Sequence, residues 1–355
     1  MSNPSFWQEK ITLAGQRVPR FMTAPMDGVI DSPMRQIIRE FSPDVLMFTE
    51  MRHVDMVANE PTGKSLCYHP GERPLVFQFS ANRTPFIGKA VERVLAAGFT
   101  AVNLNVACPA PAVVRSGSGS ALMAALPTLT IIIKELQRCL AGRAPLSIKM
   151  RAGFKQKNAL EVAHCAQDLG CEAIIIHPRT QPERFTATLD YDLVATIKKT
   201  VHIPVIFSGN ITKFDIAQRI YTLTGCDGFM IGRALWGTPW KLKAIMAAAV
   251  DHTFTIDQET VFRCIITHLN LNKDFYGQYG YAHFKKHLAH YIKAFANATQ
   301  WRSSLLRTQS EEDMRMQLNT LIKEMRATSQ ATSTTAATAD ATKQATTAAM
   351  ADNDT

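Results

Sequence analysis

The side chains best suited to chemistry stand at the ends of short apolar runs. One run holds Asn103 and Asn105 and leads into Cys108, another ends in Lys149, and a third ends in His177. A thiol in such a place can act as a nucleophile or proton donor, although a single cysteine is more often a small buried hydrophobe. A lysine directly after an apolar strand can neutralise negative charge on a reduced cofactor ring. These residues therefore predict a site for acid–base chemistry beside a planar ligand.

Further polar residues at run ends extend this prediction. Ser208–Asn210 follows one run and Gly232-Arg233 follows the last. Glycine lets a ligand approach the backbone closely and arginine offers a charged fork, so both turns are candidates for phosphate binding. Two ordinary turns with a solvated arginine are the simpler alternative. Gln78 has apolar neighbours, and its amide must find buried partners, which a heterocycle with imide-like donors and acceptors would supply.

The elements that position these residues alternate between strand and helix. Near-continuous apolar strands separated by helices indicate a parallel sheet that is covered on both faces. Eight such units fit a closed (β/α)8 barrel, a TIM barrel, better than an open sheet, and its active site would lie at the carboxyl ends of the strands. No G-x-G-x-x-G fingerprint follows the first strand, which disfavours a doubly wound fold that binds a dinucleotide. The predicted strands are residues 21–26, 45–51, 75–79, 101–106, 146–150, 173–177, 205–207 and 228–231, and the helices between them include 32–41, 85–97, 126–140, 158–169 and 214–223.

The pattern changes after about residue 251, where the strand signals stop. Helical stretches at 257–272, 280–296 and 311–326 predict a small α-helical C-terminal domain. From Ala327 to Thr355, ten Ala and nine Thr fill 19 of 29 positions, a composition that cannot offset its ordering entropy by burial. We therefore expect a barrel domain at 1–250, a helical domain at 251–326 and a disordered tail at 327–355.

Composition and charge exclude several classes of protein. The 355 residues include 39 Lys and Arg against 30 Asp and Glu, a net charge of +9, which fits a polyanionic partner such as RNA.

No apolar run has the length, about 18 residues, that a membrane helix needs, so no membrane partner is expected. The seven cysteines form no C-x-x-C pair, which argues against a disulfide framework and a metal site. Without an export signal, the expected location is cytoplasmic.

Six motifs stand out along the chain: APMDGVIDSPMR (24–35), NLNVACPAPAVVRSGSGSAL (103–122), IKMRAGF (148–154), IIHPRT (175–180), IPVIFSGNI (203–211) and GCDGFMIGRALWGTPW (225–240). In their order and spacing they resemble those of the tRNA-dihydrouridine synthase family, flavin enzymes that reduce uridine in tRNA. A further run, DFYGQYGYAHFKKHLAHYIKAF (274–295), resembles the bacterial DusB subgroup, which points to a D-loop uridine. The resemblance implies a barrel that binds FMN, a helical domain that binds tRNA, and NADPH or NADH as reductant. We expect a monomer.

The resemblance also implies residue roles. Cys108 is the implied catalytic acid, which would protonate C5 of uracil after a hydride has reached C6. The residues implied to bind the flavin are Pro25, Met26, Asp27, Gln78, Lys149, His177, Ser208, Gly209, Asn210, Gly232 and Arg233. The residues expected to bind tRNA or its uridine are Asn105, Arg115, Arg179, Lys286, His290 and Lys293. The last three belong to one helical stripe that also includes His283 and His287.

Several positions depart from the family pattern, and two of them lie where the ligands would bind. Ala107 stands where the family usually has glycine, and Asp27 stands where it usually has a small residue. Two other functions remain as alternatives. The first is a flavin barrel that acts on a free pyrimidine, as dihydroorotate dehydrogenase does, and the second is a non-catalytic tRNA-binding protein.

Overall fold

The computed structural model describes residues 4–328. The chain divides into two compact units, the first ending at Ile256 and the second beginning at Asp257. Among the helices of the described range, none combines the length and apolarity that a membrane crossing requires.

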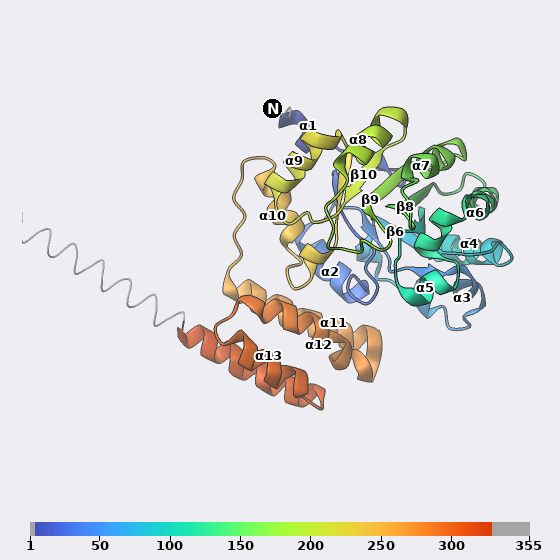
Figure 1. Ribbon diagram of the computed structural model, residues 1–355. Coiled ribbons are helices and arrows are strands. Elements are labelled where there is room, and N and C mark those ends of the chain that lie inside the picture. Colours follow the sequence, from blue (N-terminus) through green and yellow to red (C-terminus); the bar gives the residue numbers. More distant parts are fainter. Residues whose placement is uncertain (1–3, 329–355) are drawn as a thin grey trace, which may run out of the picture. The chain divides into compact units, whose positions relative to one another are not determined.

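Eight parallel strands form a nearly closed barrel in the first unit (Figure 1), which confirms the predicted fold class. Their order around the barrel follows the chain, and the backbone N–H of Thr23 donates to the carbonyl of Leu46 at 3.1 Å, between the first strand and the second. A short strand, β5 (Arg52–His53), also pairs with β6. The eight are β3 (Phe21–Thr23), β4 (Met47–Phe48), β6 (Leu75–Ser80), β7 (Val102–Val106), β8 (Leu146–Gly153), β9 (Ala173–Thr180), β10 (Val205–Ser208) and β11 (Gly228–Ile231).

The apolar runs form strands because both faces of the sheet are covered. In β9, Ile174 and Ile176 belong to the large core between the strands and the helices, whereas Ala173 and Ile175 belong to a smaller core inside the barrel. This alternation is the period of two that a β-strand imposes on its side chains. Buried apolar residues on both faces explain why the runs read as nearly continuous.

An antiparallel hairpin, β1 (Ile11–Leu13) and β2 (Gln16–Val18), adds to the core inside the barrel. Ile11 and Leu13 are members of that core. Gly228, at the start of β11, is closely packed, because a Cβ atom there would lie 2.8 Å from the Arg20 carbonyl oxygen and 2.9 Å from Ile206, and Ile11 of the hairpin lies in ordinary contact at 3.4 Å. Since β11 starts here, the hairpin fills the end of the barrel opposite to the carboxyl ends of the strands.

Helices surround the barrel (Figure 1). The five predicted between strands are all present, two of them with the predicted bounds. The longer helices are α2 (Ser32–Phe41), α4 (Ile87–Ala96), α6 (Leu126–Leu140), α7 (Ala159–Asp168), α8 (Tyr191–Thr200), α9 (Phe214–Thr224) and α10 (Lys241–Ala248). The shorter ones are α1 (Pro4–Gln8), α3 (Val54–Asn59), α5 (Pro111–Arg115), and the 3-10 turns η1 (Lys64–Leu66), η2 (Pro70–Glu72), η3 (Gly119–Ala124) and η4 (Arg233–Leu235).

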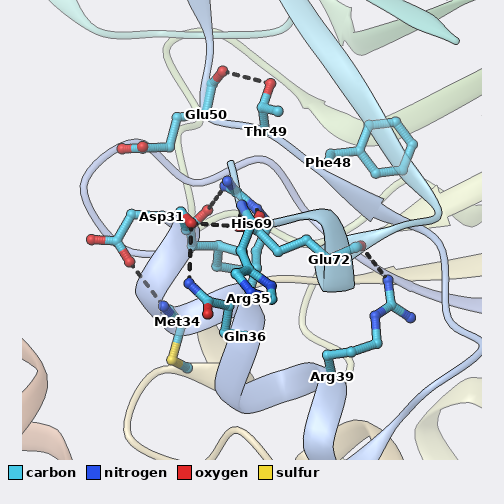
Figure 2. Close-up of polar contacts among 12 residues, drawn as sticks. Asp31, Met34, Arg35, Gln36, Arg39, Phe48, Thr49, Glu50, His69 and Glu72 are labelled. Carbon is cyan, nitrogen blue, oxygen red and sulfur yellow. Dashed lines mark hydrogen bonds and ion pairs between the residues drawn. The ribbon is translucent and has the colours of Figure 1, made fainter. Parts of the chain in front are cut away.

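A buried carboxylate fixes the segment that leads into β6. Figure 2 shows Glu72 beside Arg35 of α2, where the Arg35 Nε atom lies 2.5 Å from a Glu72 carboxylate oxygen. The backbone N–H of His69 donates to the same carboxylate at 2.7 Å, and Arg39 donates to the Glu72 carbonyl at 2.6 Å. Because a buried charge is tolerated only when it is paired and hydrogen-bonded, these contacts hold the start of β6, the strand that carries Gln78, against α2.

The second unit is α-helical. The predicted helices are present, and one that the sequence did not predict, α13, lies between the last two. Its core includes Phe262, Phe284 and Leu288, all buried. The elements are α11 (Gln258–Tyr276), η5 (Gly277–Tyr279), α12 (Gly280–Tyr291), η6 (Ile292–Ala294), α13 (Ala298–Arg307) and a helix at 311–328. Ala327 and Thr328, expected in a disordered tail, are helical, and the rest of that expected tail lies outside the described residues.

Candidate active site

A cavity of about 670 Å³ opens at the carboxyl ends of the barrel strands. Every residue that the sequence assigned to the flavin lines it, and so do Cys108 and Asn105. These residues come from strands far apart in the sequence, and the closed barrel brings them to one rim. The lining residues predicted from sequence are Pro25, Met26, Asp27, Gln78, Asn105, Cys108, Lys149, His177, Ser208, Gly209, Asn210, Gly232 and Arg233.

A chain of buried polar side chains crosses three neighbouring strands below the cavity. The amide of Asn103 in β7 donates to the Ser147 hydroxyl in β8 at 2.9 Å. Gln78 in β6 donates to the Asn103 oxygen at 2.7 Å and accepts from the amide of Asn105 at 2.9 Å. These three hydrogen bonds fix which end of the Gln78 amide is donor and which is acceptor. The second N–H of Gln78 and a second lone pair on its oxygen remain for a ligand.

The turn that carries Cys108 is held from both sides. The Asn105 side-chain oxygen accepts the backbone N–H groups of Ala107 and Cys108, at 3.1 and 2.8 Å. Arg151 Nε donates to the carbonyl of Ala107 at 2.7 Å. Gly119 packs against the same turn so closely that a Cβ atom would lie 2.8 Å from the Cys108 carbonyl oxygen. The side chain of Asn105, expected to contact the substrate, therefore also positions the thiol.

Positive charge is concentrated beside the thiol. Burial lowers the pKa of Lys149 from 10.5 to about 8, and the neighbouring Arg151 lowers it further, whereas Cys108 acts in the opposite direction. Burial likewise lowers the pKa of Arg151 to about 10. In the described part of the chain, no carboxylate pairs with Lys149. The lysine is thus a half-buried cation that borders cavity space, and an anionic ligand would compensate its charge.

His177 is a neutral side chain in this site. Its Nδ1 atom lies 2.8 Å from the carbonyl of Ser208, so Nδ1 carries the hydrogen and Nε2 has a free lone pair. Burial, together with the charges of Lys149 and Arg151, lowers the pKa of His177 to about 3. The guanidinium of Arg179 lies 3.5 Å from Nε2 and can donate to it. His177 can therefore act as a hydrogen-bond acceptor but not as a cation.

Two glycine turns shape the wall opposite Cys108. Gly232 is packed so closely that a Cβ atom would lie 2.8 Å from the Met26 sulfur. Gly209 has a φ of +150°, and a Cβ atom there would lie 3.2 Å from His177 Nδ1. Arg233 Nη2 donates to the Asn210 side-chain oxygen at 2.9 Å, which joins the two turns. Their residue types and position match the phosphate-binding turns of (β/α)8 barrels.

Acidic residues flank one arginine at the rim. Arg52 lies 3.1 Å from the carboxylate of Asp27 and 3.0 Å from that of Glu50. Glu50 also accepts the N–H of Gly28 at 2.6 Å, and burial raises its pKa. The Asp27 side chain is 75% exposed, so its carboxylate is directed to the rim and to Arg52.

The remaining predicted contacts lie outside the cavity lining. Arg115 is exposed at the end of α5, and Arg179 is buried, with its Nε atom donating to the carbonyl of Ala187 at 2.5 Å. Lys286, His290 and Lys293 belong to the second unit, where Lys293 is exposed and the other two are half-buried.

The predicted basic stripe on α12 is wrong at one position. His287 is fully buried, its ring centroid 4.5 Å from that of His268 in the same unit. Burial lowers its pKa to about 3, and the positive charges of its neighbours act in the same direction. A stripe of residues three and four apart spans about 100° of a helix, so one edge of it can enter the core, as it does here.

Several lining residues escaped the sequence reasoning. Phe185 lies in the loop after β9, and Met51 and Trp236 follow strands as well. The one available signal for Phe185 was an aromatic residue in an otherwise polar segment, Gln181–Thr188. Arg151 has no role in the sequence analysis either, because its hydrogen bonds go to backbone carbonyls that the sequence does not reveal.

Comparisons with known proteins agree with this geometry. Residues 22–333 match the family model described as Dihydrouridine synthase (Dus). A probable tRNA-dihydrouridine synthase of Helicobacter pylori is 31% identical, covering 79% of this chain and 85% of its own length. The tRNA-dihydrouridine synthase B of Salmonella typhimurium is 30% identical, covering 80% and 89%. Among solved structures, histamine dehydrogenase from Rhizobium is similar in fold, with a TM-score of 0.55 at 13% identity over 76% of this chain and 51% of that one.

Proposed function

The chain belongs to the dihydrouridine synthase family, and from this premise we propose that it reduces the C5=C6 bond of D-loop uridines in tRNA to 5,6-dihydrouridine. The observation that carries the proposal is the cavity in which a positioned thiol, Cys108, borders the same space as Lys149 and Gln78. FMN is the proposed cofactor, and NADPH or NADH the proposed reductant.

The residues at the cavity fit a flavin mononucleotide. Lys149 offers a half-buried positive charge for the ring edge, which becomes anionic on reduction. Gln78 offers one donor and one acceptor with a fixed orientation. The turns at Ser208–Asn210 and Gly232-Arg233 offer backbone N–H groups and a guanidinium for the phosphate. A bound flavin would thus compensate the charge of Lys149, which pairs with no carboxylate of the described residues.

The chemistry that a reduced flavin supplies when bound is a hydride for C6 of the uracil. The protein supplies the proton for C5, and Cys108 is the acid at the cavity wall. Lys149 and Arg151 both interact electrostatically with Cys108 and would stabilise the thiolate that proton transfer leaves. General-acid assistance of this kind is worth about 10²- to 10⁴-fold in rate.

The base must leave its stack to enter a cavity at the end of a barrel, and binding of the RNA backbone would provide the energy. The net charge of +9 favours a polyanion. Arg115, Lys286, His290 and Lys293 are the proposed backbone contacts. Replacing both Lys286 and Lys293 with alanine should weaken tRNA binding. The slope of log affinity against log salt concentration should fall by the amount expected for the loss of about two phosphate contacts.

Rapid mixing of the two half-reactions tests the role of Cys108. Cys108→Ala should be reduced by NADPH at the wild-type rate but should be reoxidised by tRNA about 10²- to 10⁴-fold more slowly. Cys67→Ala is the matched control, because Cys67 is an exposed thiol outside the cavity lining. Equal slowing of both half-reactions would contradict the assigned role. Turnover of free uracil or dihydroorotate without turnover of tRNA would favour a free-pyrimidine enzyme instead.

A further inference from the structure

Phe185 is an exposed aromatic residue in the wall of the cavity. It lies in the segment between β9 and α8, and 48% of its surface is accessible. An isolated exposed hydrophobic residue on an outer surface needs no explanation, but this one faces the space into which a substrate must enter. We propose that Phe185 is the residue against which the extruded tRNA base packs, an inference that rests on the proposed function.

The loop around Phe185 is tethered on both sides of the ring. Arg151 Nη1 donates to the carbonyls of Thr180 and Arg184, at 3.0 and 3.2 Å. The Arg179 guanidinium holds the carbonyl of Ala187 at 2.5 Å, two residues beyond the ring. The ring is therefore presented from a loop whose backbone is fixed, so that a planar ligand would meet it with little ordering cost.

Two cations from distant parts of the barrel approach the ring. The guanidinium carbon of Arg233, after β11, is 4.8 Å from the ring centroid, and that of Arg151, in β8, is 5.6 Å away. The His177 ring meets it in a T-shaped arrangement at 6.0 Å. Arg151 also holds the turn of Cys108. Phe185 is thus connected, through one guanidinium, to the side of the cavity that carries the thiol.

The chemistry of this surface fits a nucleobase. A base that leaves its stack loses aromatic contacts, and stacking on a protein side chain is worth about 1–3 kcal/mol per base, or about 5- to 150-fold in affinity. Arginines beside the ring add positive charge where the RNA backbone must approach. Phe185 would therefore contact the base without taking part in proton transfer.

The test measures both half-reactions of the flavin-loaded, full-length protein with Phe185→Ala, Phe185→Leu and Phe185→Tyr. Alanine and leucine should weaken the apparent tRNA affinity in the reoxidation step by about 5- to 150-fold, and tyrosine should restore it. Reduction by NADPH should not change in any of them. Ile131→Ala, in an exposed residue of α6, is the control for loss of surface hydrophobic area, and it should leave both steps unchanged.

Three other outcomes would overturn the inference in distinguishable ways. If Phe185→Ala slows reduction by NADPH and leaves reoxidation unchanged, the ring packs against the nicotinamide instead. If neither step changes while the wild-type protein is reoxidised by tRNA, the proposed function stands and Phe185 has no part in it. If tRNA does not reoxidise the wild-type protein at all, the proposed function fails, and this inference fails with it.

Discussion

Lys149 is a half-buried cation that has no carboxylate partner within residues 4–328, and its replacement should change fold stability and flavin binding in opposite directions. Burial lowers the pKa of Lys149 from 10.5 to about 8. That difference of 2.5 pKa units corresponds to about 3 kcal/mol of destabilisation at neutral pH. Lys149→Met keeps the length of the side chain and removes the charge. The flavin-free variant should therefore be more stable than the flavin-free wild type, by up to about 3 kcal/mol.

The pH dependence has a definite sign. A lysine whose folded pKa lies below its unfolded pKa destabilises the fold fully below the folded value, and the penalty disappears as pH rises toward the unfolded value. The wild-type protein should thus gain stability relative to Lys149→Met between about pH 8 and about pH 10.5. The same substitution would remove the charge-assisted hydrogen bond that we propose to the flavin, so binding of FMN should weaken by about 10- to 100-fold.

Two measurements check this prediction. Urea unfolding of the flavin-free proteins at about pH 7 and about pH 10 gives the free energies of unfolding, and titration with FMN gives the affinities. Lys155→Met is the control, since Lys155 is exposed and outside the cavity lining. If Lys149→Met is no more stable than the wild type at neutral pH, or binds FMN equally well, the role assigned to the half-buried cation is wrong.

Three further predictions concern two supports of the site and one carboxylate that holds the hairpin at the opposite end of the barrel. Gly119→Ala would place a Cβ atom 2.8 Å from the Cys108 carbonyl oxygen at a φ of +59°. Thermal unfolding should therefore show a loss of stability of about 1–3 kcal/mol, and reoxidation of the flavin by tRNA should slow. An unchanged reoxidation rate would mean that the turn tolerates displacement. Asn103→Leu leaves the Gln78 amide N–H without its buried acceptor, so it should cost about 1–3 kcal/mol and shift the flavin absorption spectrum; an unchanged spectrum would mean that the Gln78 amide does not meet the flavin. Burial raises the pKa of Glu172 to about 6. The wild-type protein should therefore lose about 2 kcal/mol in its free energy of unfolding as pH rises from about 4.5 to about 6. Glu172→Gln should show no such loss, and parallel profiles of unfolding free energy against pH for the two proteins would contradict the assignment.

The barrel could be predicted from the sequence because its strands are buried on both faces. Each apolar run is long enough to be recognised, and in seven of the eight a polar residue at or near the end of the run lines the cavity. The hairpin at residues 11–18 could not be predicted, because its strands have three residues each and such short runs carry little periodic signal. The helix α13 escaped for a similar reason, since only Leu305 of its ten residues is buried.

The members of the site could be predicted, but the partners of their side chains could not. Strand register places Gln78 beside Asn103 and Asn105 beside Lys149, and only the folded barrel decides that the amides bond to one another. For the same reason, Asn105 looked like a free substrate contact although its oxygen already accepts two backbone N–H groups. His287 was misplaced because a helical period does not distinguish the solvent side of a stripe from its core side.

The central claim is that this protein forms dihydrouridine in tRNA. Mass-spectrometric mapping of tRNA from cells that lack the protein, compared with the same cells complemented by the wild type or by Cys108→Ala, tests it most directly. The account predicts that dihydrouridine is absent from at least one D-loop position in the deleted strain, returns with the wild-type protein, and does not return with Cys108→Ala. An unchanged dihydrouridine map in the deleted strain would contradict it.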